Sequence, residues 1–209
     1  MKKSKPNQYT IFNMPLVRFF FKGLSLLLMK LTGWKKSGSL PDVPQYIIVV
    51  APHTSNWDLF YGIIVAFSLG LDARFMAKSE LFRPPFGPIM KWLGGMPIDR
   101  SSHEHTVDQV VRIFREGGRL ALAIAPEGTR SRAKYWKSGF YHIAAGAGVP
   151  IQLGYLDYPS KTGGAGPLII PTGDIEGDMA LIRDFYRGVS GRFTDKAGPV
   201  SLTGHSINP

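Results

Sequence analysis

Short runs of β-branched and other apolar residues recur along the 209-residue chain and give it its clearest pattern. The runs at residues 46–51, 120–125 and 150–155 are continuous, as expected for strands that are buried on both faces. Between them, apolar residues recur at helical spacing, and glycines mark several of the helix ends. This spacing predicts helices over residues 56–69, 85–93, 101–116, 139–146 and 178–188.

Shorter extended segments complete the pattern. We expect strands at residues 74–77, 96–98 and 167–171, and a hairpin or loop at the glycine-rich residues 163–167. Because strand and helix alternate, the sequence predicts a single α/β domain with a mostly parallel central sheet flanked by helices. Binding sites in such folds gather at the carboxyl ends of the strands. The polar turns that follow the strands are therefore the expected place of a functional site.

The basic charge of the chain is concentrated at its N-terminus. The formal net charge is +10, and residues 1–40 contain eight Lys and Arg residues but no Asp or Glu. Large apolar residues lie between them, but Arg18, Lys22 and Lys30 interrupt the run, and a spanning helix needs roughly 20 mostly apolar residues. Phe and Leu mixed with basic residues are typical of a helix that lies on anionic lipid. We therefore expect residues 1–40 to be a basic amphipathic segment that anchors the protein monotopically, at the cytoplasmic face of the cell membrane.

Two other interpretations of this segment stay open. A signal peptide begins similarly, but residues 29–36 offer no small-residue cleavage site. The second is an ordinary helix that packs on the domain and keeps its basic residues in solvent. After this segment we expect the α/β domain at residues 41–190 and a flexible tail at residues 191–209, which lack periodicity. The chain contains no cysteine, which excludes disulfides and cysteine nucleophiles.

Two polar residues follow the first buried strand at a spacing that suits acid–base chemistry. His53 lies in the turn after the strand, and Asp58 falls five residues later, near the start of the predicted helix. Five residues of regular helix rotate a side chain by about 500°, so both cannot lie mid-helix and still meet. With His53 in the turn and Asp58 in the first helical turn, the carboxylate can orient the imidazole as a general base. The pair taken alone is weak evidence, because a histidine near a strand end is more often structural.

A second polar turn follows another buried strand. Residues 127–130, in the order Glu, Gly, Thr and Arg, place a carboxylate, a flexible glycine, a hydroxyl and a guanidinium side by side. Arginine binds phosphate through two parallel hydrogen bonds, and glycine lets the backbone approach a ligand closely. Arg100, after the short strand at residues 96–98, offers a second guanidinium. These residues predict a phosphate site beside the histidine, although ion pairs that only hold loops together would use the same residue types.

Four blocks between residues 53 and 151 resemble the glycerolipid acyltransferase family, which contains the 1-acylglycerol-3-phosphate acyltransferases. The first is the H-x4-D pattern of His53 and Asp58, and the second is a glycine-led strand that ends in Arg100. The third is the segment 126–131, and the fourth is a Val-Pro-Ile strand at residues 149–151. The order and the spacing of the blocks are similar to those of the family.

The resemblance implies an acyltransferase that moves a fatty acyl group from acyl-CoA or acyl carrier protein to the hydroxyl of a lysophosphatidate-like lipid, without a further cofactor. His53 would be the general base, and Asp58 its partner. The implied substrate- and phosphate-binding residues are Lys78, Arg100, Glu127, Gly128, Thr129, Arg130 and Pro150. The family also uses N-terminal helices to lie on the membrane, in agreement with the expectation for residues 1–40.

The sequence favours some alternative functions and disfavours others. Residues 54–57 and Met96 depart from the commoner fillings of the family motifs, so another lipid alcohol, such as an ornithine- or glycolipid-like molecule, is a second candidate acceptor. A non-enzymatic lipid-binding module would keep the basic segment but would not need the two polar turns. A metal hydrolase is disfavoured, because the two histidines of residues 103–105 point to different sides of a helix, and we expect no metal site. The basic residues form no nucleic-acid recognition motif, so no nucleic-acid partner is expected.

Overall fold

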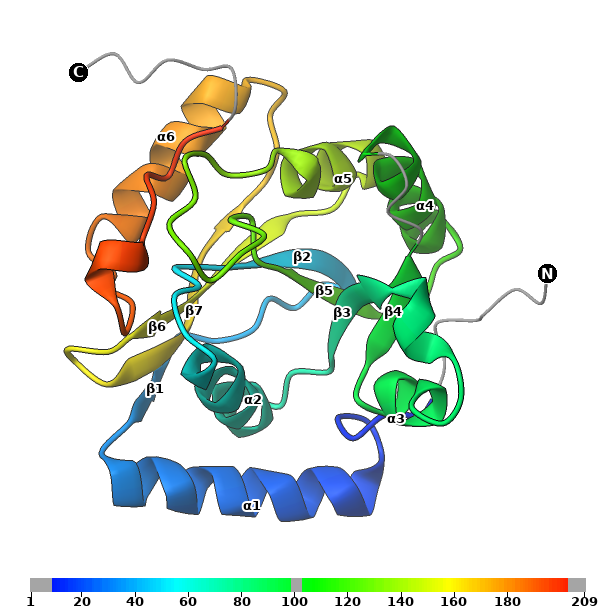
Figure 1. Cartoon of the computed structure of the whole chain (residues 1–209), viewed down its shortest axis with the longest axis vertical. Coiled ribbons are helices and arrows are strands. Elements are labelled where there is room, and N and C mark those ends of the chain that lie inside the picture. Colours follow the sequence, from blue (N-terminus) through cyan, green and yellow to red (C-terminus); the bar gives the residue numbers. More distant parts are fainter. Residues whose placement is uncertain (1–8, 99–102, 203–209) are drawn as a thin grey trace.

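The computed structural model describes residues 9–98 and 103–202, which form one seven-stranded sheet with helices around it (Figure 1). The strands are β1 (Lys35–Ser37), β2 (Gln45–Val50), β3 (Ala73–Lys78), β4 (Gly95–Ile98), β5 (Leu120–Ile124), β6 (Ile151–Asp157) and β7 (Thr162–Ile169). The α-helices are α1 (Pro15–Thr32), α2 (Trp57–Leu69), α3 (Gly87–Trp92), α4 (His103–Arg115), α5 (Gly139–Ala147) and α6 (Ile175–Tyr186). Two short 3₁₀ helices, η1 (Ser79–Phe82) and η2 (Thr194–Lys196), complete the described elements.

The sheet is parallel except where β7 joins it. Its strand order is β1-β7-β6-β2-β5-β3-β4, with β2 at the centre between β6 and β5. Strands β2 to β6 run in one direction, whereas β7 pairs with β6 in the antiparallel sense. The turns that follow β2 to β6 therefore leave the sheet at one edge, which we call the carboxyl edge.

Alternating side chains of the central strands build a core on each face of the sheet. Ile47 and Val49 of β2 are fully buried in the larger core, which they share with residues of α4, α5 and α6. Tyr46 and Ile48 are buried in a separate cluster on the opposite face. This period of two, with both sets of side chains covered, explains why the strand sequence is continuously apolar.

Helix α2 is apolar around most of its circumference, because it lies between the sheet and α1 (Figure 1). The four consecutive residues 64–67 are buried. Phe67 stacks on Phe21 of α1 with ring centroids 5.2 Å apart, and Arg18 of α1 donates a hydrogen bond to the carbonyl oxygen of Gly70. A helix with apolar residues on all sides is expected where neighbours cover both of its sides.

The observed architecture confirms the predicted fold class, and most predicted elements lie within a few residues of the observed ones. Of the hairpin or loop predicted at residues 163–167, the loop is wrong, because these residues belong to β7, which forms an antiparallel hairpin with β6. Their glycines make this possible: a Cβ on Gly164 would lie 1.9 Å from the carbonyl oxygen of Ser37, so only glycine lets β1 and β7 pair this closely.

Two predicted domain boundaries also change. Residues 35–37 form a strand of the same sheet as β2, so the segment 1–40 is not separate from the α/β domain. The flexible tail predicted from residue 191 is wrong for residues 191–202, because Gly191, Ser201 and Leu202 are buried. The predicted start of a helix at Ser101 lies outside the described residues.

Candidate active site

His53 and Asp58 face each other at the carboxyl edge of the sheet. Helix α2 begins at Trp57, so His53 lies in the turn after β2 and Asp58 in the first helical turn. His53 Nδ1 is 3.2 Å from Asp58 Oδ2. The side chain of Asp58 is buried, whereas that of His53 is 22% exposed, so a substrate can reach the imidazole. With Nδ1 held by the carboxylate, Nε2 is the nitrogen left to accept a proton.

Both carboxylate oxygens of Asp58 accept hydrogen bonds. Its Oδ2 also accepts from the backbone N–H groups of Thr54 and Ser55, each at 2.8 Å. Its Oδ1 accepts from the hydroxyl of Tyr158 at 2.7 Å. Burial alone would raise the pKa of Asp58, but these hydrogen bonds and the one from His53 outweigh it and lower the pKa. Asp58 therefore stays ionised near neutral pH and can stabilise a protonated imidazole.

Tyr158 is a member of the site that the sequence did not indicate. It follows β6 directly, so it reaches the same edge of the sheet as His53. Its ring packs edge-on against Trp34, with centroids 5.2 Å apart, and against Tyr61 at 6.0 Å. Burial and the hydrogen bond to Asp58 raise the pKa of Tyr158, which keeps its hydroxyl protonated as a donor. A lone tyrosine matches no motif, but its position at the end of a parallel strand could have pointed to it.

Glu127 holds the turn that carries His53. Its Oε1 accepts a hydrogen bond from the backbone N–H of His53 at 3.0 Å. The side chain is buried, and its Oε2 has no hydrogen-bond partner among the described residues. Burial raises the pKa of Glu127, and the bond from His53 only partly offsets this. The resemblance placed Glu127 with the phosphate-binding residues, but its observed contact is with the turn that carries His53.

The rest of this turn is open to solvent. Gly128 adopts φ +66°, a left-handed conformation that favours glycine, and it turns the chain after the buried Glu127. Thr129 and Arg130 are exposed, and Thr129 Oγ1 accepts from the N–H of Ser131 at 3.1 Å. Arg130 lines a pocket together with residues 54–57. The structure thus brings Arg130 to the pocket beside the turn that carries His53.

The three remaining predicted site residues, Lys78, Arg100 and Pro150, are not all at the carboxyl edge. Lys78 is the last residue of β3, so its backbone lies at the carboxyl edge. Arg100 lies outside the described residues, two positions after the end of β4 at that edge. Pro150 precedes β6, and its carbonyl oxygen accepts from the N–H of Ile47 near the start of β2. The structure therefore places Pro150 toward the opposite edge of the sheet and does not bring it together with His53.

The described part of the site is suited to proton transfer beside an anion. It combines the accessible imidazole of His53, the buried carboxylate of Asp58 that orients it, and the exposed residue Arg130 in the pocket beside residues 54–57. Within residues 9–98 and 103–202, no group of three His, Asp or Glu side chains could hold a metal ion.

Comparison with known proteins identifies the family. A family model described as Acyltransferase matches residues 36–152, which include both polar turns. The chain belongs to this acyltransferase family. Family membership thus rests on the segment that also carries the His53–Asp58 pair.

The relatives of the chain within the family are lipid acyltransferases. The 1-acyl-sn-glycerol-3-phosphate acyltransferase of Haemophilus influenzae is 29% identical over 134 residues, 59% of this chain and 54% of that protein. The protein of the same description from Escherichia coli is 33% identical over 110 residues, 50% of this chain and 44% of that protein. The chain therefore spans about half the length of these curated relatives.

A solved structure shares the fold. The 1-acyl-sn-glycerophosphate (LPA) acyltransferase PlsC from Thermotoga maritima superposes with a TM-score of 0.55 at 19% sequence identity. The match covers 82% of this chain and 78% of that chain. The α/β arrangement of sheet and helices is thus one that the family uses.

Replacing Tyr158 by Phe tests whether its hydroxyl acts through Asp58. We expect kcat to fall about fivefold to tenfold, the effect of losing one hydrogen bond worth about 1 kcal/mol. The low pKa of Asp58 stabilises the fold above the unfolded-state value of about 3.9, and this contribution is lost as the pH falls further. The free energy of unfolding, measured in urea, should therefore be lower in Tyr158→Phe than in the wild type near neutral pH. This difference between the two proteins should become smaller in acid.

The matched control for Tyr158 is Tyr61→Phe, because Tyr61 lies in the same aromatic cluster and no hydrogen bond from its hydroxyl to Asp58 is present. This control should leave both kcat and the pH dependence of stability unchanged. Equal effects of the two substitutions would assign Tyr158 a packing role alone.

Substitutions of Glu127 separate a positioning role from phosphate binding. Glu127→Gln keeps an oxygen that can accept from the His53 N–H, whereas Glu127→Ala removes it. Because a displacement of about 1 Å in a catalytic group can cost about 100-fold in rate, we expect Glu127→Ala to lower kcat to that extent and Glu127→Gln much less. A rise in acceptor KM with unchanged kcat in both variants would instead place Glu127 in contact with the acceptor.

Proposed function

We propose that the protein is an O-acyltransferase that moves a fatty acyl group from acyl-CoA or acyl carrier protein to the hydroxyl of a lysophosphatidate-like lipid at a membrane surface. The observation that carries the proposal is the His53–Asp58 contact of 3.2 Å at the carboxyl edge, in a chain of the acyltransferase family. The names of the relatives support a lysophosphatidate acceptor.

The reaction needs one base and no acyl-enzyme. The acceptor hydroxyl gives its proton to Nε2 of His53 while its oxygen attacks the thioester carbon, and a tetrahedral intermediate forms. The carbon–sulfur bond then breaks, and the thiolate takes the proton back from His53. Asp58 remains ionised throughout and stabilises the imidazolium. The N–H groups of Thr54 and Ser55 already donate to Asp58, so they do not serve the oxyanion.

The acceptor phosphate is assigned to the cationic part of the carboxyl edge. Arg130 lines the pocket beside residues 54–57 and is exposed. The backbone of Lys78 ends β3 at this edge, and Arg100 follows β4. Arginine can bind a phosphate through two parallel hydrogen bonds, whereas lysine acts as a point charge. A phosphate held here would lie next to the base.

Apolar side chains beside the base support a lipid substrate. Trp57 and Phe60, in the first turns of α2, are 49% and 43% exposed, and Leu59 between them is 61% exposed. Three large exposed apolar residues in one short stretch are uncommon on a soluble surface without a function. We assign this surface to the acyl chain of a substrate.

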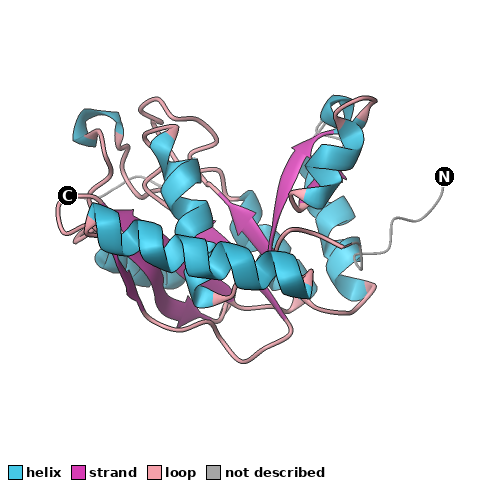
Figure 2. Ribbon diagram, turned by 90° about the horizontal axis from the view of Figure 1, so that it is seen from below, coloured by secondary structure: helices cyan, strands magenta, loops and turns pink. Residues whose placement is uncertain are grey.

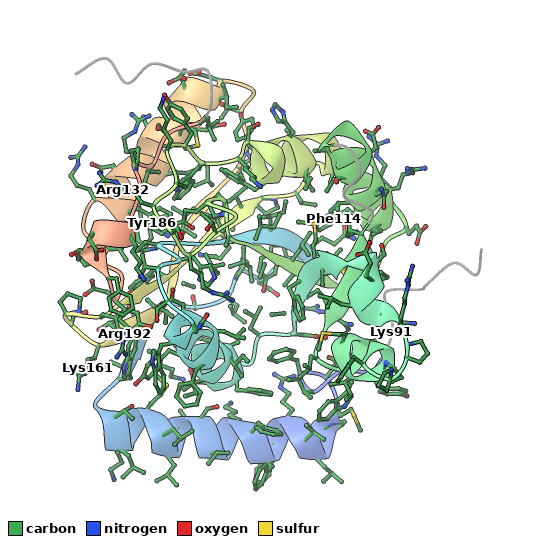
Figure 3. All side chains as sticks on the ribbon, in the orientation of Figure 1. Lys91, Phe114, Arg132, Lys161, Tyr186 and Arg192 are labelled. Carbon is green, nitrogen blue, oxygen red and sulfur yellow. The ribbon has the colours of Figure 1, made fainter. Side chains whose placement is uncertain are left out.

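Helix α1 is the proposed contact with the membrane. One face of α1 packs on α2, and the helix lies in front of the sheet in the view of Figure 2. Its opposite face carries large exposed side chains, which point away from the sheet in Figure 3. These are Leu16, Phe19, Phe20, Leu27 and Leu31. Lys22 and Lys30 are exposed on the same helix and can meet anionic headgroups. Among the described helices, none is long and apolar enough to cross a bilayer. We propose a monotopic association at the cytoplasmic face of the cell membrane.

Replacing His53 by Ala tests the catalytic assignment. General-base catalysis contributes about 10²- to 10⁴-fold, so acyl transfer from a radiolabelled donor should fall by at least about 100-fold. Vesicle binding and circular dichroism should be unchanged. His142→Ala is the matched control, because His142 is exposed on α5, on the other side of the sheet from α2, and it should retain full activity. Wild-type activity of His53→Ala would refute His53 as the base.

Negative charge introduced on the exposed face of α1 tests the membrane contact. Phe19→Glu combined with Leu31→Glu places two carboxylates on the exposed face, where the side chains are 81% and 73% exposed, so folding should be preserved. We expect co-sedimentation with vesicles of phosphatidylglycerol and phosphatidylethanolamine to be lost. Leu181→Glu on α6, where Leu181 is 59% exposed, is the control and should still co-sediment. Unchanged binding by the α1 variant would place the membrane contact elsewhere.

A further inference from the structure

The last described segment of the chain, residues 189–202, crosses the carboxyl edge of the sheet, and we call it the C-terminal strap. It begins beside β6, where the N–H of Ser190 donates to Asp157 Oδ1 at 2.9 Å. It then passes the turn after β2, where the N–H of Phe193 donates to Thr54 Oγ1 at 3.3 Å. In Figure 1 the strap is the orange and red segment that follows α6. The strap thus touches the residue that directly follows His53.

Close packing holds the strap against this turn. Gly191 is buried, and a Cβ at this position would lie 2.8 Å from Thr54 Oγ1 and 3.1 Å from the ring of Pro52. At its far end, the carbonyl oxygen of Ser201 accepts from the N–H of Trp136 at 2.7 Å. The strap lies beyond residues 36–152, so the family match assigns no role to it.

A pocket lies between the strap and the turn after β2. It is lined by residues 54–57 and Arg130 on one side and by Phe193 and Lys196 of the strap on the other. Lys196 Nζ lies 4.6 Å from the centroid of the Phe193 ring, a cation–π contact that favours this position of the ammonium group. Neither Arg130 nor Lys196 forms an ion pair with a carboxylate of the described residues.

The charged residues that line the pocket, Arg130 and Lys196, are both basic, and Arg130 belongs to a basic segment of the chain. Residues 128–138 contribute four Arg and Lys residues and no Asp or Glu. Glu127 is buried and bonded to the His53 N–H, and Asp195 of the strap forms no ion pair within the described residues. A concave site lined by charges of one sign concentrates ligands of the opposite sign.

A second cation of the strap stands beside the pocket. The guanidinium of Arg192, labelled in Figure 3, lies over the rings of Trp57 at 5.3 Å, Phe193 at 5.8 Å and Tyr158 at 6.0 Å. Its N–H groups donate to no acceptor among the described residues. The aromatic rings therefore hold a planar hydrogen-bond donor in place while its polar groups remain available to a ligand.

We propose that the C-terminal strap completes a binding site for a phosphate group of the substrate, with Lys196 opposite Arg130 in the pocket and Arg192 beside it. The inference rests on the proposed acyl transfer and adds to it a substrate-binding element outside the family match. A phosphomonoester carries between one and two negative charges near neutral pH and offers three acceptor oxygens, which suits several converging cations. Two substrates contain such a group: the lysophosphatidate acceptor and the CoA of the donor.

Isothermal titration of the full chain without an acyl donor tests the site apart from catalysis. The probes are a short-chain lysophosphatidate and its phosphate-free monoacylglycerol, and CoA with its phosphate-free analogue pantetheine. The variants are Lys196→Ala and the charge-conserving Lys196→Arg. Arg119→Ala is the matched control, because Arg119 is an exposed cation that precedes β5 at the opposite edge of the sheet.

We expect Lys196→Ala to weaken the binding of lysophosphatidate roughly tenfold, the effect of losing a hydrogen bond to a charged group. Lys196→Arg and Arg119→Ala should bind it as the wild type does, and monoacylglycerol should bind equally to all four proteins. If CoA is weakened in place of lysophosphatidate, the strap holds the donor phosphate. Unchanged binding of both phosphate ligands, equal loss of the phosphate-free ligands, or no wild-type binding of either phosphate ligand would overturn the proposal.

The same proteins separate this inference from the proposed function. If the phosphate ligands bind and depend on Lys196 but no donor yields an acylated product, the strap site stands and acyl transfer fails. If acyl transfer proceeds and the KM for the phosphate-bearing substrate is the same in Lys196→Ala, the strap inference fails and the proposed function stands.

Discussion

The candidate active site depends on one buried carboxylate. Asp58 accepts from the imidazole of His53, from two backbone N–H groups and from the hydroxyl of Tyr158. Hydrogen bonds to a charged group contribute about 1.5–3 kcal/mol each, so together they offset the cost of removing the carboxylate from water. Because the donors come from the turn after β2 and from the end of β6, this carboxylate also fixes the two strand ends relative to each other. A residue without a side-chain oxygen at position 58 would leave the N–H groups of Thr54 and Ser55 without this acceptor.

The parallel sheet explains why residues far apart in sequence meet at this carboxylate. Strands β5, β2 and β6 lie side by side and point the same way, so Glu127, His53 and Tyr158 follow their ends at one edge. Below this edge, the hydroxyl of Tyr186 lies 2.9 Å from the carbonyl oxygens of Val49 and Gly154, on neighbouring strands. Burial raises the pKa of Tyr186 well above its usual range, so this link between the strands is a neutral hydrogen bond. The site therefore lies at the ends of strands that the buried hydroxyl of Tyr186 links.

The sequence predicted the elements whose signal is periodic, and it missed the contacts that no periodicity encodes. The buried strands and the His53–Asp58 geometry follow from apolar runs and from the rotation per residue of a helix. The role of Glu127 is a contact with a main-chain N–H, which side-chain types in a motif do not reveal. Strand β7 was hidden because its glycines, which permit close pairing with β1, are also typical of loops. The sequence predicts a flexible tail from residue 191 because this segment has no repeating apolar face, whereas in the structure hydrogen bonds from backbone N–H groups hold the strap.

The proposed lysophosphatidate acceptor would require the proposed base and the anion site to adjoin. In a lysophosphatidate the free hydroxyl and the phosphate are separated by only a few bonds, so a base far from the cations could not act on a phosphate-bound molecule. Residues 54–57 directly follow His53 and form one wall of the pocket that Arg130 and Lys196 line on its other sides. Thr54 links the two functions, because its N–H donates to Asp58 and its Oγ1 accepts from the strap. In the proposed function, a single turn of the chain would thus set the distance between proton transfer and phosphate binding.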